Sequence, residues 1–283
     1  MNIEDLEIDD IYVNPYTTNA IYGEEDLKQF PTAIWCGTHK TTSRSLDRWF
    51  KKFYSRIRRI LKKANGQTPV FMLYMMPNRD LGQYSKGGSK GFKNYKRFIN
   101  LFIQALGDNQ AIVLIESDSF PHLKKLVGTD LFDERVACLS YAIDQLSAKT
   151  DCLLYLDIGH PAWLKPEYVA DLLTFLPREK LRGYCINVSN FVPVDICEQY
   201  AEHIWRYTHQ PCIIDTSRNG GVYPVSHWCN PPEQRLGPKP QMIKSKSVDM
   251  YMWIKIPGES DGKQGGFPRA GKWSRDLVKL LKG

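Results

Sequence analysis

The chain contains 283 residues, of which 42% are hydrophobic and 24% are charged, and 38 Lys and Arg residues against 31 Asp and Glu residues give a formal net charge of +7. This composition excludes a disordered or collagen-like chain, and no segment approaches the roughly 18 apolar residues of a membrane span, so we expect a globular protein without a membrane partner. The length fits two domains of about 150 residues or one α/β barrel.

Seven apolar runs rich in β-branched and aromatic residues predict strands. In chain order they are Thr32–Cys36, Val70–Met75, Ala111–Ile115, Cys152–Asp157, Gly183–Val188, Pro211–Ile214 and Tyr251–Ile256. Helical periodicity lies between them at Ser43–Ala64, with Thr42 as its cap, and at Lys93–Leu106, Leu131–Leu146, Pro166–Leu176, Asp195–Tyr207 and Ala270–Leu281.

Strands that alternate with helices predict a parallel sheet, and no Ser/Gly/Pro-rich linker divides the chain. We therefore expect an α/β fold in which residues 1–283 form a single distorted TIM-like barrel with about seven or eight parallel strands, residues 1–10 being a short N-terminal extension. A doubly wound open sheet is the alternative, but it should offer a Gly-rich phosphate turn. The run Gly87–Gly91 matches neither a P-loop nor a dinucleotide fingerprint.

Most of the excess positive charge lies in the predicted helix Ser43–Ala64, whose basic residues share the segment with an apolar stripe. A charge run of this kind is typical of a solvated helix face, which we favour over a nucleic-acid surface. The acidic N-terminus lacks the basic and apolar regions of a secretory signal. It indicates a leaderless intracellular protein or a chain trimmed of its leader.

The seven cysteines are scattered singly at positions 36, 138, 152, 185, 197, 212 and 229. No CxxC or Cys/His spacing suggests zinc, and several of the cysteines lie in apolar runs, so we interpret them as small core residues.

Acidic residues follow five of the predicted strands, where a barrel places its chemistry. They are Asp80, Glu116, Asp118, Asp157, Asp215, Glu259 and Asp261. So many oxygens could hold Mg²⁺ or Ca²⁺, or they could raise one another's pKa to make a general acid beside a base. Several Trp residues and His160 lie near the same strand ends. Aromatic rings stack on pyranoses while carboxylates act on the glycosidic oxygen, so the combination favours a glycosidase.

The motifs at these strand ends make the chain resemble glycoside hydrolase family 6, the family of inverting endoglucanases and cellobiohydrolases. Eight segments occur in the order that the family has them: Tyr12–Pro15, Tyr74–Asp80, Ile115–Ser119, Tyr155–Trp163, Asn187–Asn190, Asp215–Gly220, Trp228–Asn230 and Trp253–Gly262. They span nearly the entire chain.

The resemblance implies a catalytic role for five residues. Asp118 is similar to the general acid, and Asp80 to the neighbour that keeps this acid protonated. Tyr74 is similar to the tyrosine that favours a distorted sugar ring. Asp261 matches the candidate base, acting through water, and Ser85 matches the serine that helps to place this water.

The resemblance also implies substrate-binding and supporting residues. Trp163 and Trp228 would stack on sugars, and hydrogen bonds to glucose hydroxyls would come from His160, Asn187, Lys255 and Glu259. Arg79, Asp157 and Asp215 would support the acid cluster. No metal or organic cofactor is implied.

The chain departs from the family pattern near the acid and at the cysteines. Ser117 replaces a proline beside Asp118, which would loosen the acid's position. Leu81 replaces a cysteine and Cys229 has no evident partner, so both family disulfides are expected to be absent. This weakens the inference of secretion that the family supports, and the localisation stays open.

The leading hypothesis is an inverting endo-β-1,4-glucanase that is a monomer and acts on β-1,4-glucan or cello-oligosaccharides, with no nucleic-acid partner. Cellobiohydrolases of the family roof the site with a long loop after the last motif, whereas here only Lys263–Gly271 separates this motif from the last helix. The resemblance therefore implies an open cleft. The alternatives are a cellobiohydrolase, a mixed-linkage or soluble β-glucanase, an inactive glycan-binding protein, and a polyanion-binding protein that uses the basic helix.

Overall fold

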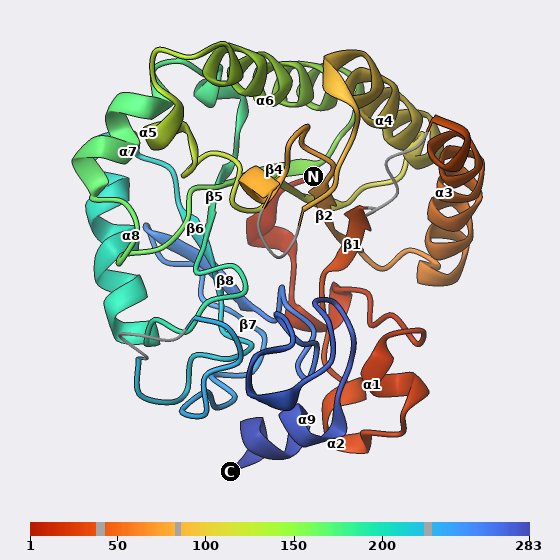
Figure 1. Ribbon diagram of the computed structural model, residues 1–283, viewed down its shortest axis with the longest axis vertical. Coiled ribbons are helices and arrows are strands. Elements are labelled where there is room, and N and C mark those ends of the chain that lie inside the picture. The colour runs from red at the N-terminus through yellow and green to blue at the C-terminus, as the bar shows by residue number, and fades with distance from the viewer. Residues whose placement is uncertain (38–42, 83–85, 224–227) are drawn as a thin grey trace.

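One curled sheet of eight strands organises the molecule (Figure 1). The computed structural model describes residues 1–37, 43–82, 86–223 and 228–283. The strands are β1 Ile34–Gly37, β2 Val70–Tyr74, β3 Ile112–Ile115, β4 Leu153–Asp157, β5 Gly183–Ile186, β6 Cys212–Asp215, β7 Gln241–Met242 and β8 Val248–Met252. Their order is β1-β2-β3-β4-β5-β6-β8-β7, and only the β7–β8 pair is antiparallel.

The long helices lie outside the sheet and surround it (Figure 1). Those that follow the parallel strands are α3 Ser43–Ala64, α4 Gly91–Leu106, α6 Asp130–Lys149, α7 Pro166–Leu173 and α8 Val194–Thr208. Shorter helices are α1 Thr18–Ile21, α2 Glu25–Lys28 and α5 Leu123–Leu126, and α9 Arg275–Lys282 ends the chain. None of the helices in the described ranges is long and apolar enough to cross a membrane.

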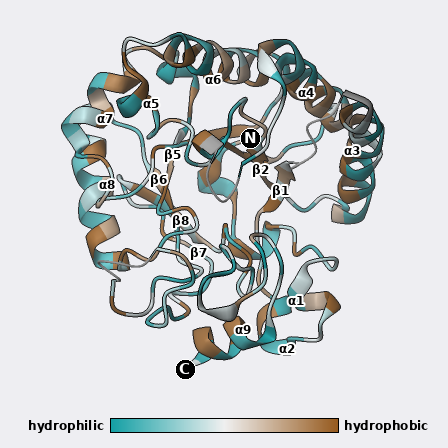
Figure 2. Ribbon diagram, in the orientation of Figure 1, coloured by the Kyte–Doolittle hydropathy of each residue, from teal (hydrophilic) through white to brown (hydrophobic). Residues whose placement is uncertain are grey.

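The sheet separates two apolar clusters. The outer helices carry both hydrophobic and hydrophilic residues along their length (Figure 2). Residues alternate along each strand, so Val70 and Met72 of β2 face the barrel interior while Phe71 and Leu73 pack against the helices. Both faces of a parallel strand are covered, which explains the continuous apolar runs in the sequence. Ile3 joins the interior cluster, so the N-terminal residues are packed against the barrel.

The barrel closes only loosely between its first and last parallel strands. Beyond the ends of β1 and β8, Thr32 and Trp253 form an isolated parallel bridge, and the Ala33 N–H donates to the Trp253 carbonyl oxygen at 3.2 Å. The Trp35 indole N–H donates to the Ile254 carbonyl oxygen at 2.9 Å across the same join. The predicted distorted barrel is therefore confirmed, and the sequential strand order excludes the doubly wound alternative.

The predicted elements match the observed ones to within three residues at each end, with three larger differences. The helix Ser43–Ala64 is confirmed residue for residue, although its expected cap Thr42 lies outside the described residues. The last parallel strand is Val248–Met252 rather than Tyr251–Ile256, and the last helix begins at Arg275 rather than Ala270. The antiparallel strand β7 and the short helices α1, α2 and α5 were not predicted.

A bulge in β8 explains why that strand was misplaced. The register passes from Cys212↔Val248 to Ile213↔Met250, so Asp249 is an extra residue in the strand. Its buried carboxylate accepts hydrogen bonds from the Tyr155 hydroxyl at 2.5 Å and from the Arg182 guanidinium at 2.7 and 3.1 Å. A charged residue thus interrupts the apolar pattern by which a buried strand is recognised.

We expect Asp249→Asn to lower the free energy of unfolding by about 2–3 kcal/mol, because breaking a buried ion pair leaves Arg182 without its carboxylate. Urea unfolding would measure this loss. The matched control is Asp144→Asn, which removes the exposed pair with Lys180 and should cost less than about 1 kcal/mol. Equal losses of unfolding free energy in the two variants would contradict a stabilising role for the buried Asp249 carboxylate in the bulge.

Candidate active site

Buried polar side chains at the carboxyl ends of the strands hold the backbone of the loops beside them. Glu116, directly after β3, accepts hydrogen bonds from the Met75 and Met76 N–H groups after β2 at 2.9 Å each. Asp157, the last residue of β4, accepts from the N–H groups of Asp118 and Gly159 at 2.8 and 2.7 Å. The backbone around the site is thereby tied to the sheet.

Asp215, the last residue of β6, has the largest set of such bonds. One carboxylate oxygen accepts from the N–H groups of Ser189 and Lys255 at 2.8 and 3.1 Å. The other accepts from Ser217 and Ile254 at 3.0 and 3.2 Å. Burial raises the pKa of Asp215, and these donors act in the opposite direction. Asp215 therefore anchors three loops at once.

Asp118 lies beside Tyr74 at the end of β2 and β3. Its carboxylate Oδ2 accepts from the Tyr74 hydroxyl at 3.3 Å, and its backbone has a left-handed φ of 64°. Burial raises the pKa of Asp118 to about 6, and the negative charge of Asp80 adds to the rise. The Tyr74 hydrogen bond and the charges of Arg79 and Lys255 act against it. Asp118 thus holds its proton at a higher pH than an exposed aspartate.

Arg79 fixes the ring of Tyr74. Its guanidinium lies 4.0 Å from the ring centroid and donates to the Tyr74 carbonyl oxygen at 2.6 Å. Trp35 of β1 packs edge-on against the same ring, with centroids 5.2 Å apart. Asp80 follows Arg79 with a left-handed φ of 56° and begins a short 3₁₀ turn. Ser85, the predicted water-positioning residue, lies outside the described residues.

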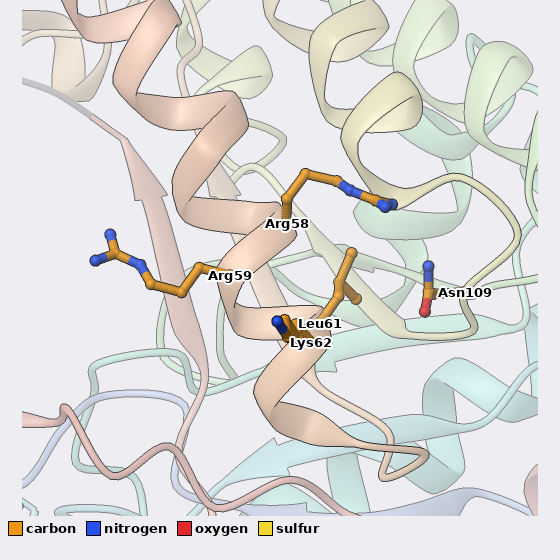
Figure 3. A pocket seen from close by; sticks show the side chains of 5 residues that line it. All are labelled: Arg58, Arg59, Leu61, Lys62 and Asn109. Atoms are coloured by element: carbon orange, nitrogen blue, oxygen red, sulfur yellow. The ribbon is translucent and has the colours of Figure 1, made fainter.

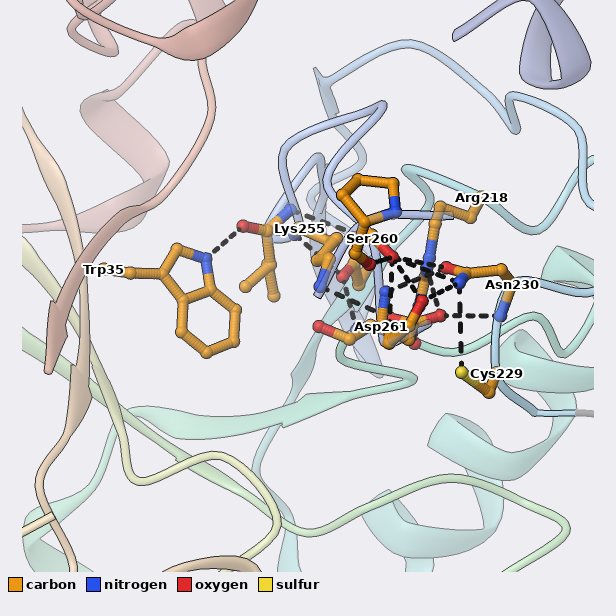
Figure 4. A network of polar contacts seen from close by, with 12 residues as sticks. Trp35, Arg218, Cys229, Asn230, Lys255, Ser260 and Asp261 are labelled. Atoms are coloured by element: carbon orange, nitrogen blue, oxygen red, sulfur yellow. Dashed lines mark hydrogen bonds and ion pairs between the residues drawn. The ribbon is translucent and has the colours of Figure 1, made fainter. Parts of the chain in front are cut away.

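Asp261 occupies a different electrostatic environment on the opposite side of the β1–β8 join (Figure 4). Arg218 donates to its Oδ2 at 2.8 Å, and the Lys255 ammonium lies 3.3 Å from its Oδ1. Burial favours the protonated form of Asp261, but the two cations outweigh it and lower the pKa below its ordinary value. Asp261 is therefore held ionised.

Asn230 and Ser260 build the frame around Asp261 (Figure 4). The Asn230 N–H donates to Asp261 Oδ2 at 3.1 Å, and its side-chain oxygen accepts from the Asp261 N–H at 2.8 Å. The Ser260 hydroxyl lies 2.8 and 2.7 Å from the carbonyl oxygens of Gly262 and Pro268 and donates its one hydrogen between them. These bonds fold the segment after Asp261 back upon itself.

Glu259 faces the N-terminal segment rather than the acid cluster. The Thr18 hydroxyl donates to its Oε1 at 3.5 Å, and burial raises the pKa of Glu259. Glu259 also forms an antiparallel bridge with Trp273, whose ring stacks on Tyr22 with centroids 4.3 Å apart. Helix α1 and the loop after β8 therefore pack against each other.

The predicted stacking residues differ in exposure. Trp163 is partly buried between two imidazoles, with ring centroids 5.1 Å from His122 and 5.7 Å from His160. Burial lowers the pKa of both histidines to about 4, so both are neutral at ordinary pH. Trp228 is 51% exposed.

Asn187, a predicted sugar ligand, is fully buried, and its side chain is bonded to the backbone. Its amide nitrogen donates to the Val192 and Asp215 carbonyl oxygens at 3.1 and 3.0 Å, and its oxygen accepts from the Val192 N–H at 3.1 Å. This arrangement indicates a structural role and disfavours contact with a sugar.

Sequence reasoning missed two residues that shape the site, namely Arg218 and Asn230, and it listed Glu116 only as one of the strand-end acids. Each lies in a family motif quoted above, but the motif does not say which neighbours the side chain meets.

In the described part of the chain, no three His, Cys, Asp or Glu residues are grouped as a metal site would need. All seven cysteines are described, and all are free.

Comparison with known proteins places this geometry in a family. Residues 16–282 match Glycosyl hydrolases family 6. Endoglucanase A of Cellulomonas fimi is 34% identical over 217 residues, which cover 76% of this chain and 47% of that protein. Endoglucanase 1 of Streptomyces sp. (strain KSM-9) is 33% identical over 206 residues, with coverages of 71% and 57%. The chain therefore spans about half the length of these curated relatives.

Solved structures show the same architecture. The endoglucanase Cel6 from Mycobacterium tuberculosis, in complex with methyl-cellobiosyl-4-deoxy-4-thio-β-D-cellobioside, has a TM-score of 0.88 at 29% identity and covers 100% of this chain and 98% of its own. The catalytic core of the cellobiohydrolase Cel6A from Chaetomium thermophilum has a TM-score of 0.77 at 21% identity, with coverages of 96% and 95%, and supports the fold alone. The family match extends over nearly the whole sequence: the chain belongs to glycosyl hydrolase family 6.

Proposed function

We propose that this chain is a catalytic domain that hydrolyses internal β-1,4 bonds of cellulose or related β-glucans with inversion. The observation that carries the proposal is the contrast between two buried aspartates on opposite sides of one strand-end surface. Asp118 has a pKa raised to about 6, whereas Asp261 is held ionised by two cations. A pair of carboxyl groups with opposite protonation states is what acid and base catalysis of glycoside hydrolysis requires.

Asp118 is the general acid in this mechanism. It transfers its proton to the glycosidic oxygen as the bond from that oxygen to the anomeric carbon breaks, and a water molecule attacks the opposite face of the same carbon. Asp80 raises the proton affinity of Asp118, since two nearby carboxylates do not easily both ionise. Its negative charge also stabilises positive charge that develops at the anomeric carbon.

Asp261 receives the proton of the attacking water. Its low pKa makes it a weak base. In this proposal the proton reaches it through one or more further waters, which Ser85 helps to place. The same cations that lower the pKa keep the carboxylate unprotonated at the pH where Asp118 is still protonated. The two requirements are therefore compatible over a window of acidic to neutral pH.

The remaining site residues bind or orient the substrate. The neighbours Arg79 and Trp35 hold Tyr74 against Asp118, where it limits the conformation of the reacting sugar. Trp163 and Trp228 provide stacking faces, and His160, Lys255 and Glu259 provide polar groups. We assign Asn187 to the scaffold, together with Asp157 and Asp215, because its side chain is bonded to backbone at both ends.

Endo action is supported by the short segment that follows the candidate base. Residues 263–271 fold against the site's own frame, with the Gly271 N–H donating to the Ser260 carbonyl oxygen at 2.8 Å and the Ser260 N–H to the Lys272 carbonyl oxygen at 2.9 Å. A short segment that is tied back in this way supports an open cleft. A second support is that the two curated relatives described above are both named endoglucanases.

On carboxymethylcellulose we expect the viscosity to fall rapidly with few new reducing ends, because internal cleavage shortens long chains at once. With cello-oligosaccharides, NMR of the first-formed product should show the α-anomer, since one displacement inverts the anomeric carbon. A slow viscosity change with many reducing ends would indicate exo action, and an initial β-anomer would overturn the single displacement. If the protein hydrolyses no β-glucan at any pH, the proposal that it is an enzyme is wrong.

Asp118→Ala should lower kcat on unactivated glucans by about 10²–10⁴-fold, because general acid catalysis contributes on this scale. Steady-state kinetics would measure the loss, and circular dichroism would confirm folding. Asp133→Ala, at an exposed position of α6, is the matched control and should retain full activity. Normal hydrolysis by the Asp118 variant would exclude it as the acid.

The alkaline limb of the pH–rate profile should report Asp118, with activity falling as pH rises through about 6 and the acid loses its proton. Asp80→Asn removes a negative charge that raises this pKa, so the limb should move to lower pH. The position of the limb, rather than the height of the profile, is the measurement. An unchanged or upward-shifted limb would show that Asp80 does not tune the acid.

A further inference from the structure

Helix α3 carries an unbalanced block of positive charge. From Arg48 to Lys63 the sequence contains eight Lys and Arg residues and no Asp or Glu. Seven of these eight side chains are exposed: Arg48, Lys51, Lys52, Arg58, Arg59, Lys62 and Lys63. We call these seven residues the basic face. They supply as many positive charges as the whole chain has in excess.

The basic face is not neutralised by carboxylates of the fold. Among the ion pairs formed within the described ranges, none involves a residue of the basic face. The contacts that these residues make are of other kinds. Arg58 donates to the Ala105 carbonyl oxygen at 3.4 Å, and the Lys63 ammonium lies 4.8 Å from the Tyr16 ring centroid. A surface of one sign attracts polyanions.

A groove of about 430 Å³ lies along the C-terminal half of this face, lined by Arg58, Arg59, Leu61, Lys62 and Asn109 (Figure 3). Arg58 extends from α3 toward α4 above Asn109, with Lys62 nearby, and Arg59 extends from the other side of the helix. The Asn109 side-chain nitrogen donates to the Leu106 carbonyl oxygen at 2.6 Å, which leaves its side-chain oxygen to accept from a ligand. The groove thus combines cations, one amide oxygen and an aliphatic side chain.

We propose that the basic face and its groove bind a carboxylate-bearing polysaccharide, one in which uronate sugars recur along the chain. Guanidinium groups pair with carboxylates in a bidentate manner, and an amide oxygen accepts hydrogen bonds from sugar hydroxyls. No aromatic side chain lines the groove, whereas single-stranded nucleic acids are bound by stacking on such rings. The lack of aromatic rings disfavours a single-stranded nucleic acid, and the guanidinium groups together with the amide oxygen favour an acidic sugar polymer.

The position of the groove separates this binding from catalysis. Helix α3 runs from the carboxyl end of β1 to the amino end of β2, so the groove near its C-terminus lies toward the opposite end of the barrel from Asp118 and Asp261. A bound acidic polymer would hold the protein without occupying the strand ends. The inference does not depend on the proposed hydrolysis, because binding and activity are measured separately.

The test uses the full chain and polygalacturonate as the probe. Affinity electrophoresis should show binding that weakens as NaCl rises from about 50 to about 500 mM, since exposed charges are screened. The triple variant Arg58→Gln, Arg59→Gln, Lys62→Gln should bind about tenfold more weakly or worse, because exposed ion pairs each contribute modestly. Its hydrolysis of neutral cello-oligosaccharides should equal that of the parent chain.

A matched triple variant removes the same charge elsewhere. Lys124→Gln, Lys125→Gln, Lys149→Gln changes exposed cations of α5 and α6 and should bind polygalacturonate like the parent chain. Equal weakening in both triple variants would show that only net charge matters and would overturn the proposed site. Tighter binding of a DNA duplex than of polygalacturonate at equal salt would make the face a nucleic-acid surface, and retained binding by the groove variant would also refute the proposal.

Discussion

The hydrogen bond from a backbone N–H to a buried side-chain oxygen is the interaction on which the site of this protein depends. Glu116, Asp157 and Asp215 each place a carboxylate at the end of a strand and use it to hold two or more N–H groups of adjoining loops. The bonded loops contain left-handed backbone at Asp118 and Ser189, a conformation that costs of order 1–3 kcal/mol at each residue. The carboxylates supply the constraint that keeps these conformations in place.

This arrangement requires several buried acids to coexist, and the fold treats them differently. Asp261 is matched by Arg218 and Lys255 and stays ionised, whereas Asp118 has a tyrosine hydroxyl as its hydrogen-bond partner and another acid in its vicinity, so its proton is retained to higher pH. Both side chains are buried, so the difference follows from their charged neighbours: Arg218 and Lys255 contact Asp261, whereas the negative charge of Asp80 acts on Asp118. The placement of the buried cations therefore decides which of the buried aspartates is ionised.

The fold was largely predictable, because parallel strands covered on both faces produce unmistakable apolar runs and helix α3 has a strong periodic stripe. Prediction failed where a buried charge interrupts the pattern, as Asp249 does in the β8 bulge. The candidate site was predictable at the level of motifs, which predicted that Asp118 and Asp261 lie at strand ends. Motifs did not show that Asn187 is bonded to backbone or that Arg218 reaches Asp261, since these facts depend on contacts 28 to 43 residues apart in sequence. Such contacts exist only after the sheet has curled.

The loose join between β1 and β8 has a consequence for how the two candidate catalytic groups are held together. Asp118 follows β3, the third strand from the β1 edge of the sheet, and Asp261 follows β8, the last parallel strand. Going round the barrel, they are connected by continuous ladders of hydrogen bonds, but across the join they are connected by the Thr32–Trp253 bridge and the Trp35 indole. The barrel is therefore a split ring that is closed across this gap by a few contacts. The spacing between Asp118 and Asp261 across the gap accordingly depends on single backbone and indole hydrogen bonds rather than on a continuous ladder.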